Sequence, residues 1–197
     1  MFNFMQLCFA TNNAHKLAEI KALLGETFAL KTLKEIGCEE ELPETTDTIE
    51  GNSRQKAEYV WEHFGVDCFA DDSGLEIAAL NGAPGVHSAY YGGSRDFQGN
   101  IARVLEELKS EHDRSARFKT VITLVVQGKV YQFEGVITGQ LLKEQRGSQG
   151  FGYDPIFVPD GHERTFAEMS IEEKGKISHR SRAFAQLVDF LKSYSED

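Results

Sequence analysis

Apolar side chains along the chain follow two spacings, one typical of helices and one typical of strands. Leu17, Ile20 and Leu24, for example, recur at the spacing of a helix face directly after a short apolar run. Helices alternate with strands early and a hairpin of two long strands comes late, which indicates an α/β protein with a mixed sheet. The elements predicted, in chain order, are a strand over 6–11, a helix over 14–24, a strand over 28–33, a helix over 49–64, a short buried strand over 68–70, a helix over 96–110, strands over 117–126 and 129–137, and a helix after 178.

The composition limits the kinds of partner that the protein can have. Its 197 residues, 41% hydrophobic and 26% charged, have the size and balance of one soluble globular domain, so we expect a single domain over 1–197. The net charge of −10 argues against broad binding to nucleic acids or anionic membranes, which require a basic surface. Basic residues that meet an anionic ligand must therefore be concentrated locally.

The cysteines and the N-terminus indicate the compartment. Cys8, Cys38 and Cys68 are scattered without paired spacing, which suits neither a disulfide framework nor a zinc site and fits a reducing cytoplasm. The apolar N-terminus lacks a basic leader, and no segment is long enough to span a bilayer. We therefore expect a cytoplasmic protein.

The first candidate site lies where a predicted strand turns into a helix, at Thr11-Asn12-Asn13-Ala14-His15-Lys16. Helix N-termini attract anions through free N–H groups and the helix dipole. A lysine in the first turn adds like charge to that end of the helix, which becomes favourable once a phosphate binds there. The alternative is that Asn12 or Asn13 caps the helix and Lys16 points into solvent.

Basic side chains also crowd the start of the last predicted helix. His179 and Arg180 follow Ser178, a natural N-cap, and Lys174 follows a capping-box pattern that begins at Ser170. Cations at two helix starts in so acidic a protein favour an anionic ligand. The alternative is that these residues are solvated on an exposed turn.

Two adjacent carboxylates, Asp71 and Asp72, follow the short predicted strand and lead into Ser73. They repel each other unless a cation or a proton separates them. Magnesium suits such a pair because it binds one or two carboxylates together with waters and phosphate oxygens. Ligands in open α/β sheets gather beyond the carboxyl ends of strands, where we expect this pair to lie. The alternative is a turn whose side chains bond to their own backbone.

Two further segments carry candidate binding residues. Glu44 precedes the helix over 49–64, and Asn52 and Lys56 flank the apolar stripe of that helix, where they either face a ligand or form an ordinary polar face. Later, Phe151 and Tyr153 lie in a glycine-rich stretch that permits close approach to a ligand, and both rings can stack on a planar base. The alternative for this stretch is a rigid loop whose rings cover the edge of the core.

Several of these motifs form an ordered set that extends from near Leu7 to Leu191. The set comprises Thr11-x-Asn13-x-x-Lys16, Glu44 with the 48–57 stretch, Asp71-Asp72-Ser73-Gly74, Gly82-Ala83-Pro84-Gly85-Val86, Phe151-Gly152-Tyr153-Asp154-Pro155-Ile156-Phe157, Glu173-Lys174 and Ser178-His179-Arg180. It resembles the inosine/xanthosine triphosphate pyrophosphatases, the Ham1-like family that acts on non-canonical purine nucleotides. The resemblance implies an elongated α/β fold with two lobes around a cleft, and a magnesium-dependent homodimer in which water attacks the α-phosphorus and pyrophosphate leaves.

The resemblance also implies a role for each matching residue. Asp72 would be the catalytic base and would hold Mg²⁺ together with Glu44, and Asp71 is a further candidate ligand. The residues that would hold the triphosphate are Thr11, Asn12, Asn13, Ala14, His15, Lys16, Lys56 and Arg180. The other substrate-binding candidates are Asn52, Ser73, Phe151, Gly152, Tyr153, Asp154, Lys174 and His179.

The substrates that the resemblance implies are ITP, dITP and XTP. Their bases accept a hydrogen bond at the six-position, where adenine carries an amino donor, so a buried site that supplies donors rejects adenine. Guanine shares the carbonyl and must be excluded through its two-amino group. The chain departs from the usual family pattern at Tyr90, where many relatives have arginine, at Gly51-Asn52-Ser53, where Glu-Asn-Ala is usual, and at Ser148-Gln149, where another glycine is common.

Two other functions remain open. A nucleotide sensor would keep the pocket without turnover, although clustered carboxylates beside phosphate ligands argue against it. A related pyrophosphatase would prefer other modified nucleotides, such as pyrimidines.

Overall fold

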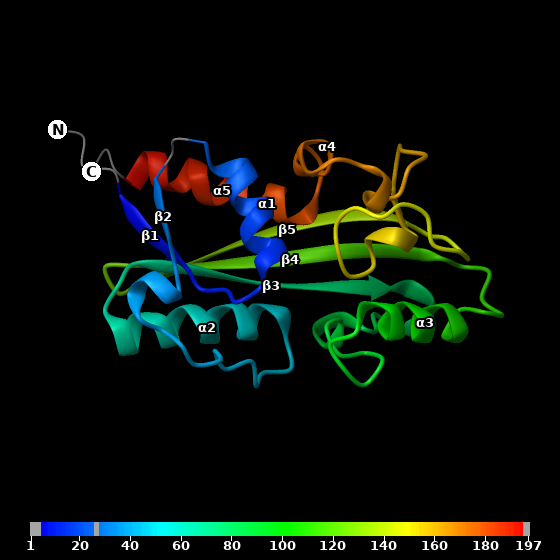
Figure 1. Cartoon of the computed structure of the whole chain (residues 1–197), viewed down its shortest axis with the longest axis horizontal. Helices are drawn as coiled ribbons and strands as arrows, with labels where there is room; N and C mark the ends of the chain where they lie inside the picture. Colours follow the sequence, from blue (N-terminus) through cyan, green and yellow to red (C-terminus); the bar gives the residue numbers. More distant parts are fainter. Residues whose placement is uncertain (1–4, 26–27, 195–197) are drawn as a thin grey trace. The chain divides into compact units, whose positions relative to one another are not determined.

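The computed structural model describes residues 5–25 and 28–194, and Figure 1 shows its elements. Within these ranges, six strands form one sheet in the order β2-β1-β3-β4-β5-β6. The strands are β1 (Gln6–Phe9), β2 (Ala29–Thr32), β3 (Cys68–Ile77), β4 (Ser115–Val126), β5 (Lys129–Leu141) and β6 (Phe157–Pro159). The α-helices are α1 (Ala14–Leu24), α2 (Ile49–Phe64), α3 (Phe97–Glu107), α4 (Ile171–Gly175) and α5 (His179–Tyr194).

The sheet is mixed, as the apolar pattern predicts. β1 pairs in parallel with both β2 and β3, whereas β5 pairs antiparallel with β6. The neighbours β4 and β5 are joined by Gln127 and Gly128, whose φ angles are both positive, at 50° and 75°. Two such residues are typical of a tight hairpin turn whose twist matches the flanking strands. The α/β fold class is therefore confirmed.

The chain divides into two compact units. Unit 1 comprises Met1–Asp72, Thr120–Gly135 and Ser181–Asp197, and unit 2 comprises Ser73–Lys119 and Val136–Arg180. Three strands, β3, β4 and β5, have residues in both units. The single domain over 1–197, the elongated shape and the cleft stay predictions.

In unit 1, helices cover both faces of the sheet (Figure 1). Phe69 of β3 packs with Ile20 of α1 and Leu187 of α5 in one apolar cluster. Its neighbour Cys68 packs with Ala57 of α2 in another cluster. Successive side chains of a strand point to opposite faces, so α1 and α5 cover one face and α2 covers the other.

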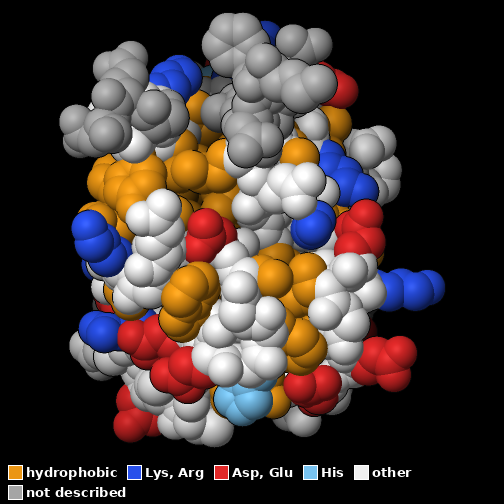
Figure 2. Space-filling view, turned by 90° about the vertical axis from the view of Figure 1, so that its left-hand side faces the viewer, with side chains coloured by type: hydrophobic (Ala, Val, Ile, Leu, Met, Phe, Trp, Pro, Cys, Tyr) orange, Lys and Arg blue, Asp and Glu red, His pale blue; other side chains and the backbone are white. Residues whose placement is uncertain are grey.

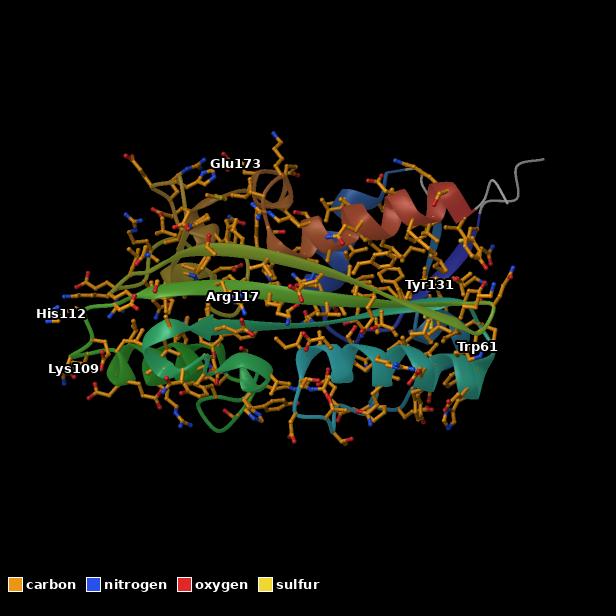
Figure 3. The ribbon with its side chains drawn as sticks, turned by 180° about the vertical axis from the view of Figure 1, so that it is seen from behind. Trp61, Lys109, His112, Arg117, Tyr131 and Glu173 are labelled. Carbon is orange, nitrogen blue, oxygen red and sulfur yellow. The ribbon has the colours of Figure 1, made fainter. Side chains whose placement is uncertain are left out.

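In unit 2, α3 packs against the sheet. Its residue Ile101 is buried in a cluster with Phe118 of β4 and Phe157 of β6. The rings of Phe118 and Phe157 meet edge-on, with centroids 4.7 Å apart, an arrangement that aromatic pairs favour. The next residue toward the N-terminus is Arg117, labelled in Figure 3, and it pairs with Glu76 of β3.

The structure confirms several predicted elements and corrects others. The bounds predicted for α1 and α2 are those observed, and the capping box at the start of α4 is present between Ser170 and Glu173. The prediction was wrong for β3, which continues to Ile77 instead of ending at residue 70. It also missed the short strand β6, which pairs with β5 along the sheet.

The surface carries charges of both signs. Acidic and basic side chains are interspersed on the face shown in Figure 2, together with exposed apolar side chains. Among the helices of the described ranges, none has both the length and the apolar composition that crossing a bilayer requires.

Candidate active site

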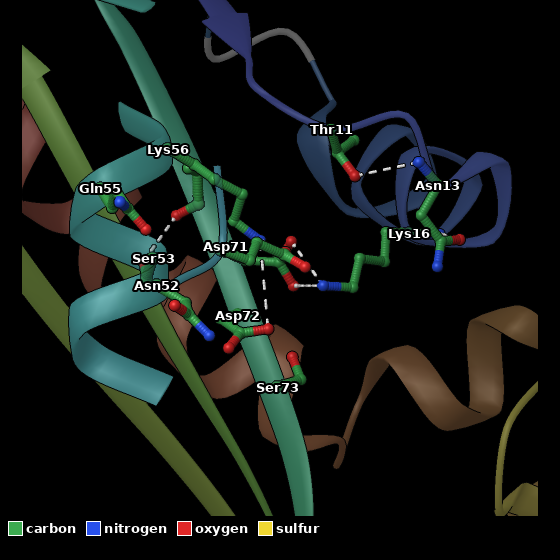
Figure 4. Close-up of polar contacts among 12 residues, drawn as sticks. Thr11, Asn13, Lys16, Asn52, Ser53, Gln55, Lys56, Asp71, Asp72 and Ser73 are labelled. Carbon is green, nitrogen blue, oxygen red and sulfur yellow. Dashed lines mark hydrogen bonds and ion pairs between the residues drawn. The ribbon is translucent and has the colours of Figure 1, made fainter. Parts of the chain in front are cut away.

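Asp71 and Asp72 lie inside β3 rather than after its end. Adjacent residues of a strand face opposite ways, and Asp71 accordingly contacts Lys16 of α1, whereas Asp72 faces Lys56 of α2 (Figure 4). The prediction that the pair follows the end of the strand was therefore wrong, and so was the alternative of a turn. Magnesium binding by these carboxylates stays a prediction. Each carboxylate faces a lysine from a different helix. Because these lysines offset the buried negative charges, β3 can continue through the polar sequence.

The acidic pair was predicted to lie beyond the carboxyl end of a strand, and the strand that ends beside it is β1. β1 ends at Phe9, which pairs with Phe69 of β3. Asp71 lies two residues after Phe69 on β3. The segment from Thr11 to Lys16 follows β1 directly and leads into α1. The acidic residues of β3 and the first turn of α1 therefore meet at the carboxyl end of a parallel strand, a common ligand position in α/β proteins.

The first turn of α1 is held by its own side chains. Asn13 Oδ1 accepts hydrogen bonds from the backbone nitrogens of His15 (3.0 Å) and Lys16 (3.2 Å), and Thr11 Oγ1 accepts one from Asn13 N (3.1 Å). Asn13 is thus the helix cap, as one interpretation proposed. Lys16 does not point into solvent, however, because its Nζ lies 3.1 Å from both carboxylate oxygens of the buried Asp71. The exposed residues of this turn are Asn12, Ala14 and His15.

Lys56 is buried on α2 between two carboxylates. Its Nζ donates a hydrogen bond to Glu44, and Asp72 Oδ1 lies 4.0 Å away. Burial by itself lowers the pKa of Lys56, but the charges of Asp72, Glu44 and Asp71 outweigh it and raise that pKa above its ordinary value. Lys56 is therefore a charged ammonium in a site from which most water is excluded.

Asp72 combines burial with an unused acceptor. It is 9% exposed, and its Oδ2 makes no hydrogen bond to any residue that the structure describes. Burial raises the pKa of Asp72 above its ordinary value, and the positive charges of Lys56 and Lys16 oppose that rise. A buried carboxylate with a raised pKa and an oxygen that makes no hydrogen bond within the described residues has the properties of a general base.

The loop that carries Glu44 is tied to α2. Asn52 Oδ1 accepts hydrogen bonds from the backbone nitrogen and the hydroxyl of Thr46, both at 2.9 Å. Gln55 exchanges two hydrogen bonds with Thr45, of 2.9 and 2.8 Å. Asn52, a predicted substrate ligand, therefore anchors this loop through its carbonyl oxygen. Gln55, Thr45 and Thr46 were not singled out from the sequence, because their hydrogen bonds join a loop to a helix and no local pattern marks them.

In unit 2, Lys174 of α4 and Asp154 form a buried ion pair. Lys174 Nζ donates to Asp154 Oδ2 at 2.6 Å, and the same oxygen accepts a hydrogen bond from Phe151 N at 3.0 Å. Lys174 Nζ also lies 5.0 Å from the centroid of the Phe151 ring, a cation–π contact. Gly150 makes this arrangement possible, because its φ is +71° and a Cβ there would lie 2.1 Å from Asp154 Oδ2.

The start of α5 contributes two buried basic side chains to unit 2. Arg180 is 1% exposed, its Nη2 donates to Ser73 Oγ at 3.1 Å, and its guanidinium carbon lies 5.6 Å from the Phe151 ring centroid. His179 stacks on Phe118, with ring centroids 4.7 Å apart and planes 12° apart. The interpretation of these residues as solvated was therefore wrong.

Tyr153 belongs to the core of unit 2. It is 4% exposed, its hydroxyl donates to Ser88 O at 2.8 Å, and burial raises the pKa of that hydroxyl. A ring packed in this way cannot stack on a base, so the stacking interpretation of Tyr153 was wrong and its ring covers the core. Its place among the substrate-binding residues stays a prediction. Phe151 is only half buried and remains available to a ligand.

Comparisons with known proteins decide the family. The sequence matches the Ham1 family over residues 7–190. The chain belongs to the Ham1 family. It is 50% identical over 190 residues to a Flavobacterium psychrophilum protein named dITP/XTP pyrophosphatase, covering 96% of this chain and 100% of that one. A Porphyromonas gingivalis protein of the same name is 52% identical over 188 residues, covering 94% and 97%. The structure of a HAM1 protein from Coxiella burnetii matches with a TM-score of 0.88 and 39% identity, covering 96% and 99%.

The candidate residues of this Ham1 protein fall into two sets. Asp72 and Ser73 are consecutive on β3, so one strand carries a member of each set. Unit 1 holds Thr11, Asn12, Asn13, Ala14, His15, Lys16, Glu44, Asn52, Lys56, Asp71 and Asp72. Unit 2 holds Ser73, Phe151, Gly152, Tyr153, Asp154, Lys174, His179 and Arg180.

Tyr90, which departs from the family pattern, lies beside a cation. Tyr90 is 45% exposed, and the guanidinium carbon of Arg95 lies over its ring, 4.8 Å from the centroid. A positive charge is thus present next to position 90 although the residue there is not basic.

Proposed function

We propose that this Ham1 protein hydrolyses ITP, dITP and XTP to the nucleoside monophosphate and pyrophosphate. The observation that carries the proposal is Asp72, a buried carboxylate that faces the Lys56 ammonium and keeps Oδ2 unbonded within the described part of the chain. The names of the Flavobacterium and Porphyromonas relatives support the same reaction.

Asp72 acts on the attacking water. It takes a proton from the water as the oxygen attacks the α-phosphorus. The bond from that phosphorus to the bridging oxygen then breaks, and pyrophosphate leaves with the electron pair. A carboxylate whose pKa is raised by burial is a stronger base than an exposed one. A positioned general base accelerates such steps by about 10²–10⁴-fold.

Buried cations hold the triphosphate. Lys16 and Lys56 of unit 1 stabilise the charge that develops on the phosphoryl oxygens. Asp71 holds Lys16 in place and Glu44 holds Lys56, so little reorganisation is needed during the reaction. Hydrogen-bond donors fixed in this way stabilise negative charge more strongly in a site with little water than in bulk solvent.

Asp72 and Glu44 would hold Mg²⁺. Both carboxylates meet Lys56 Nζ, and Asp72 Oδ2 is an unbonded acceptor among the described residues. Magnesium needs only one or two protein carboxylates because waters and substrate oxygens complete its coordination, so these two residues fit it. When bound, it would neutralise phosphate charge and make the attacking water more acidic.

The nucleobase is recognised by residues of unit 2. Lys174 and His179 are buried donors, and Phe151 offers a half-buried ring on which a base can stack. Asp154 fixes Lys174 and the backbone of Phe151. Hypoxanthine and xanthine give these donors a carbonyl at the six-position, whereas adenine would leave them unpaired.

A panel of triphosphates tests the proposal. Purified protein is incubated with Mg²⁺ and ITP, dITP, XTP, ATP, GTP or a modified pyrimidine triphosphate, and pyrophosphate and phosphate are assayed separately. We expect pyrophosphate release, with kcat/KM for ITP and XTP at least about 10²-fold above that for ATP. Binding without turnover would indicate a sensor, preference for the pyrimidine would indicate a different pyrophosphatase, and release of single phosphates would indicate a phosphatase; each contradicts the proposal.

We also propose that the protein is a cytoplasmic homodimer. The family resemblance supports the dimer, and sedimentation equilibrium at twice the chain mass is the expected result, which a monomer would contradict. The cysteines support a reducing compartment, since all three are free and buried, and burial raises the pKa of Cys8 to about 12.

A further inference from the structure

A chain of hydrogen bonds crosses the buried layer between α2 and the sheet in unit 1. Ser53 of α2 is fully buried, and its Oγ lies 3.1 Å from the carbonyl oxygen of Ala70 and 2.8 Å from Thr123 Oγ1. Thr123 of β4 is also fully buried, and Nε2 of Gln132 on β5 donates to its Oγ1 at 3.0 Å. We call Ser53, Thr123 and Gln132 the polar bridge.

The hydrogens of the polar bridge have one consistent arrangement. A carbonyl oxygen only accepts, so Ser53 gives its single proton to Ala70 O. An amide nitrogen only donates, so Thr123 Oγ1 accepts from Gln132 and gives its own proton to Ser53 Oγ. The second N–H of Gln132 donates to the carbonyl oxygen of Glu50 on α2, at 3.0 Å. Every hydroxyl proton therefore has an acceptor.

Stability alone does not account for this bridge. A hydrogen bond contributes a net of only about 1 kcal/mol, and an apolar pair of the same shape can be equally stable. Hydrogen bonds differ from apolar contacts because they fix distance and direction. The bridge therefore defines where α2 lies on the sheet.

The bridge lies beside the catalytic contact. Ser53 and Lys56 are three residues apart and share a face of α2. Ala70 and Asp72 are two residues apart and share a face of β3. The Ser53–Ala70 hydrogen bond thus joins the same two elements as the 4.0 Å contact between Lys56 and Asp72 (Figure 4). A shift of α2 along β3 would change both.

We propose that Ser53 and Thr123 are positioning residues that hold Lys56 of α2 in register with Asp72 of β3. The proposal rests on the proposed function, in which Asp72 is the base and Lys56 a phosphate ligand. Loss of either hydroxyl frees α2 to move relative to β3, and a misplacement of about 1 Å can cost up to 10²-fold in rate.

Matched variants separate the hydroxyls from packing. Thr123→Val keeps the shape and removes the hydroxyl, whereas Thr123→Ser keeps the hydroxyl and removes a methyl group. Ser53→Ala removes the other hydroxyl. The control is Cys68→Ala, which removes buried packing between β3 and α2 but only a weak hydrogen bond, because a thiol such as Cys68 Sγ, 3.2 Å from Ala57 O, is a weak donor.

We expect Ser53→Ala and Thr123→Val each to lower kcat for ITP about tenfold with KM nearly unchanged. The double variant should lose no more than either single one, because both break the same chain. Thr123→Ser should keep the wild-type kcat, and Cys68→Ala should lower Tm without lowering kcat. If Ser53→Ala and Thr123→Val lower Tm but leave kcat at the wild-type value, the bridge is only structural.

Backbone amide NMR signals test the positioning without turnover. The signals of Asp71 and Asp72 should shift more in Ser53→Ala and Thr123→Val than in Cys68→Ala, and the absence of that difference would overturn the inference. A wild-type protein that fails to hydrolyse ITP would overturn the proposed function alone, because these signals would still decide the positioning role.

Discussion

Asp71 and Asp72 have the same side chain, but they point to opposite faces of β3 and therefore lie in different environments. Both oxygens of the enclosed Asp71 lie 3.1 Å from Lys16 Nζ, so its charge is matched at close range. Asp72 lies 4.0 Å from Lys56 Nζ, and its raised pKa reflects burial that the lysines only partly offset. A tightly paired carboxylate is a weak base. The environment therefore favours Asp72 as the base and Asp71 as the holder of Lys16.

The Asp72→Asn variant tests this assignment through stability as well as activity. Folding raises the pKa of Asp72, so in the metal-free protein the stability linked to this group is present at low pH and is lost as pH rises through the folded-state pKa. The variant cannot ionise, and near pH 7 it should melt at or above the wild-type temperature, with a difference that shrinks toward about pH 4. Turnover of ITP should fall at least about 10²-fold. Wild-type turnover, or a melting difference that grows as pH falls, would refute the assignment.

Lys16 pairs with Asp71 and is also a proposed phosphate ligand, and a pair of variants can separate these two roles. Lys16→Met leaves the buried Asp71 carboxylate without its cation, which should cost about 3 kcal/mol or more of the free energy of unfolding. Adding Asp71→Asn removes that charge and should restore most of the melting temperature. Binding of inorganic tripolyphosphate, measured by calorimetry, should stay weak in both variants. A double variant that binds tripolyphosphate like the wild type would show that Lys16 is not a phosphate ligand.

At the scale of elements, local signals predict helices better than they predict β3. α2 has the predicted bounds because Thr48 Oγ1 accepts a hydrogen bond from Gly51 N at its start and Gly65 adopts a left-handed conformation at its end. The polar sequence after Ala70 resembles a turn when only its neighbours in sequence are considered. The lysines that let β3 continue come from α1 and α2, which local patterns cannot reveal.

The loop before β6 contains Gly150, whose backbone lies against Asp154 of the candidate nucleotide site. Gly150→Ala adds a Cβ that would lie 2.1 Å from Asp154 Oδ2, at a φ of +71°. We expect KM for ITP to rise about tenfold or more, because the anchor of Lys174 and Phe151 is displaced. The control is Gly161→Ala, which has a φ of +79° but no atom within 4 Å of the added Cβ. Equal KM changes in the two variants would mean that backbone strain, rather than the Asp154 contact, is responsible.

At the scale of the whole molecule, the net charge of −10 opposes a triphosphate, and the cations that offset it are buried beside acids in both units. The sequence predicted which residues carry the chemistry because the motif set is specific and ordered. It did not reveal that Tyr153 packs in the core or that Asn52 anchors a loop, because both roles depend on partners from other segments. Neither did it predict the polar bridge, which joins three separate elements.

The destination of the water oxygen tests the account most directly. Hydrolysis of ITP is carried out in water enriched in the heavy oxygen isotope, and both products are analysed by mass spectrometry. If Asp72 delivers water to the α-phosphorus, the label enters only the inosine monophosphate and the pyrophosphate stays unlabelled. Label in the pyrophosphate, or in free phosphate, would contradict the account.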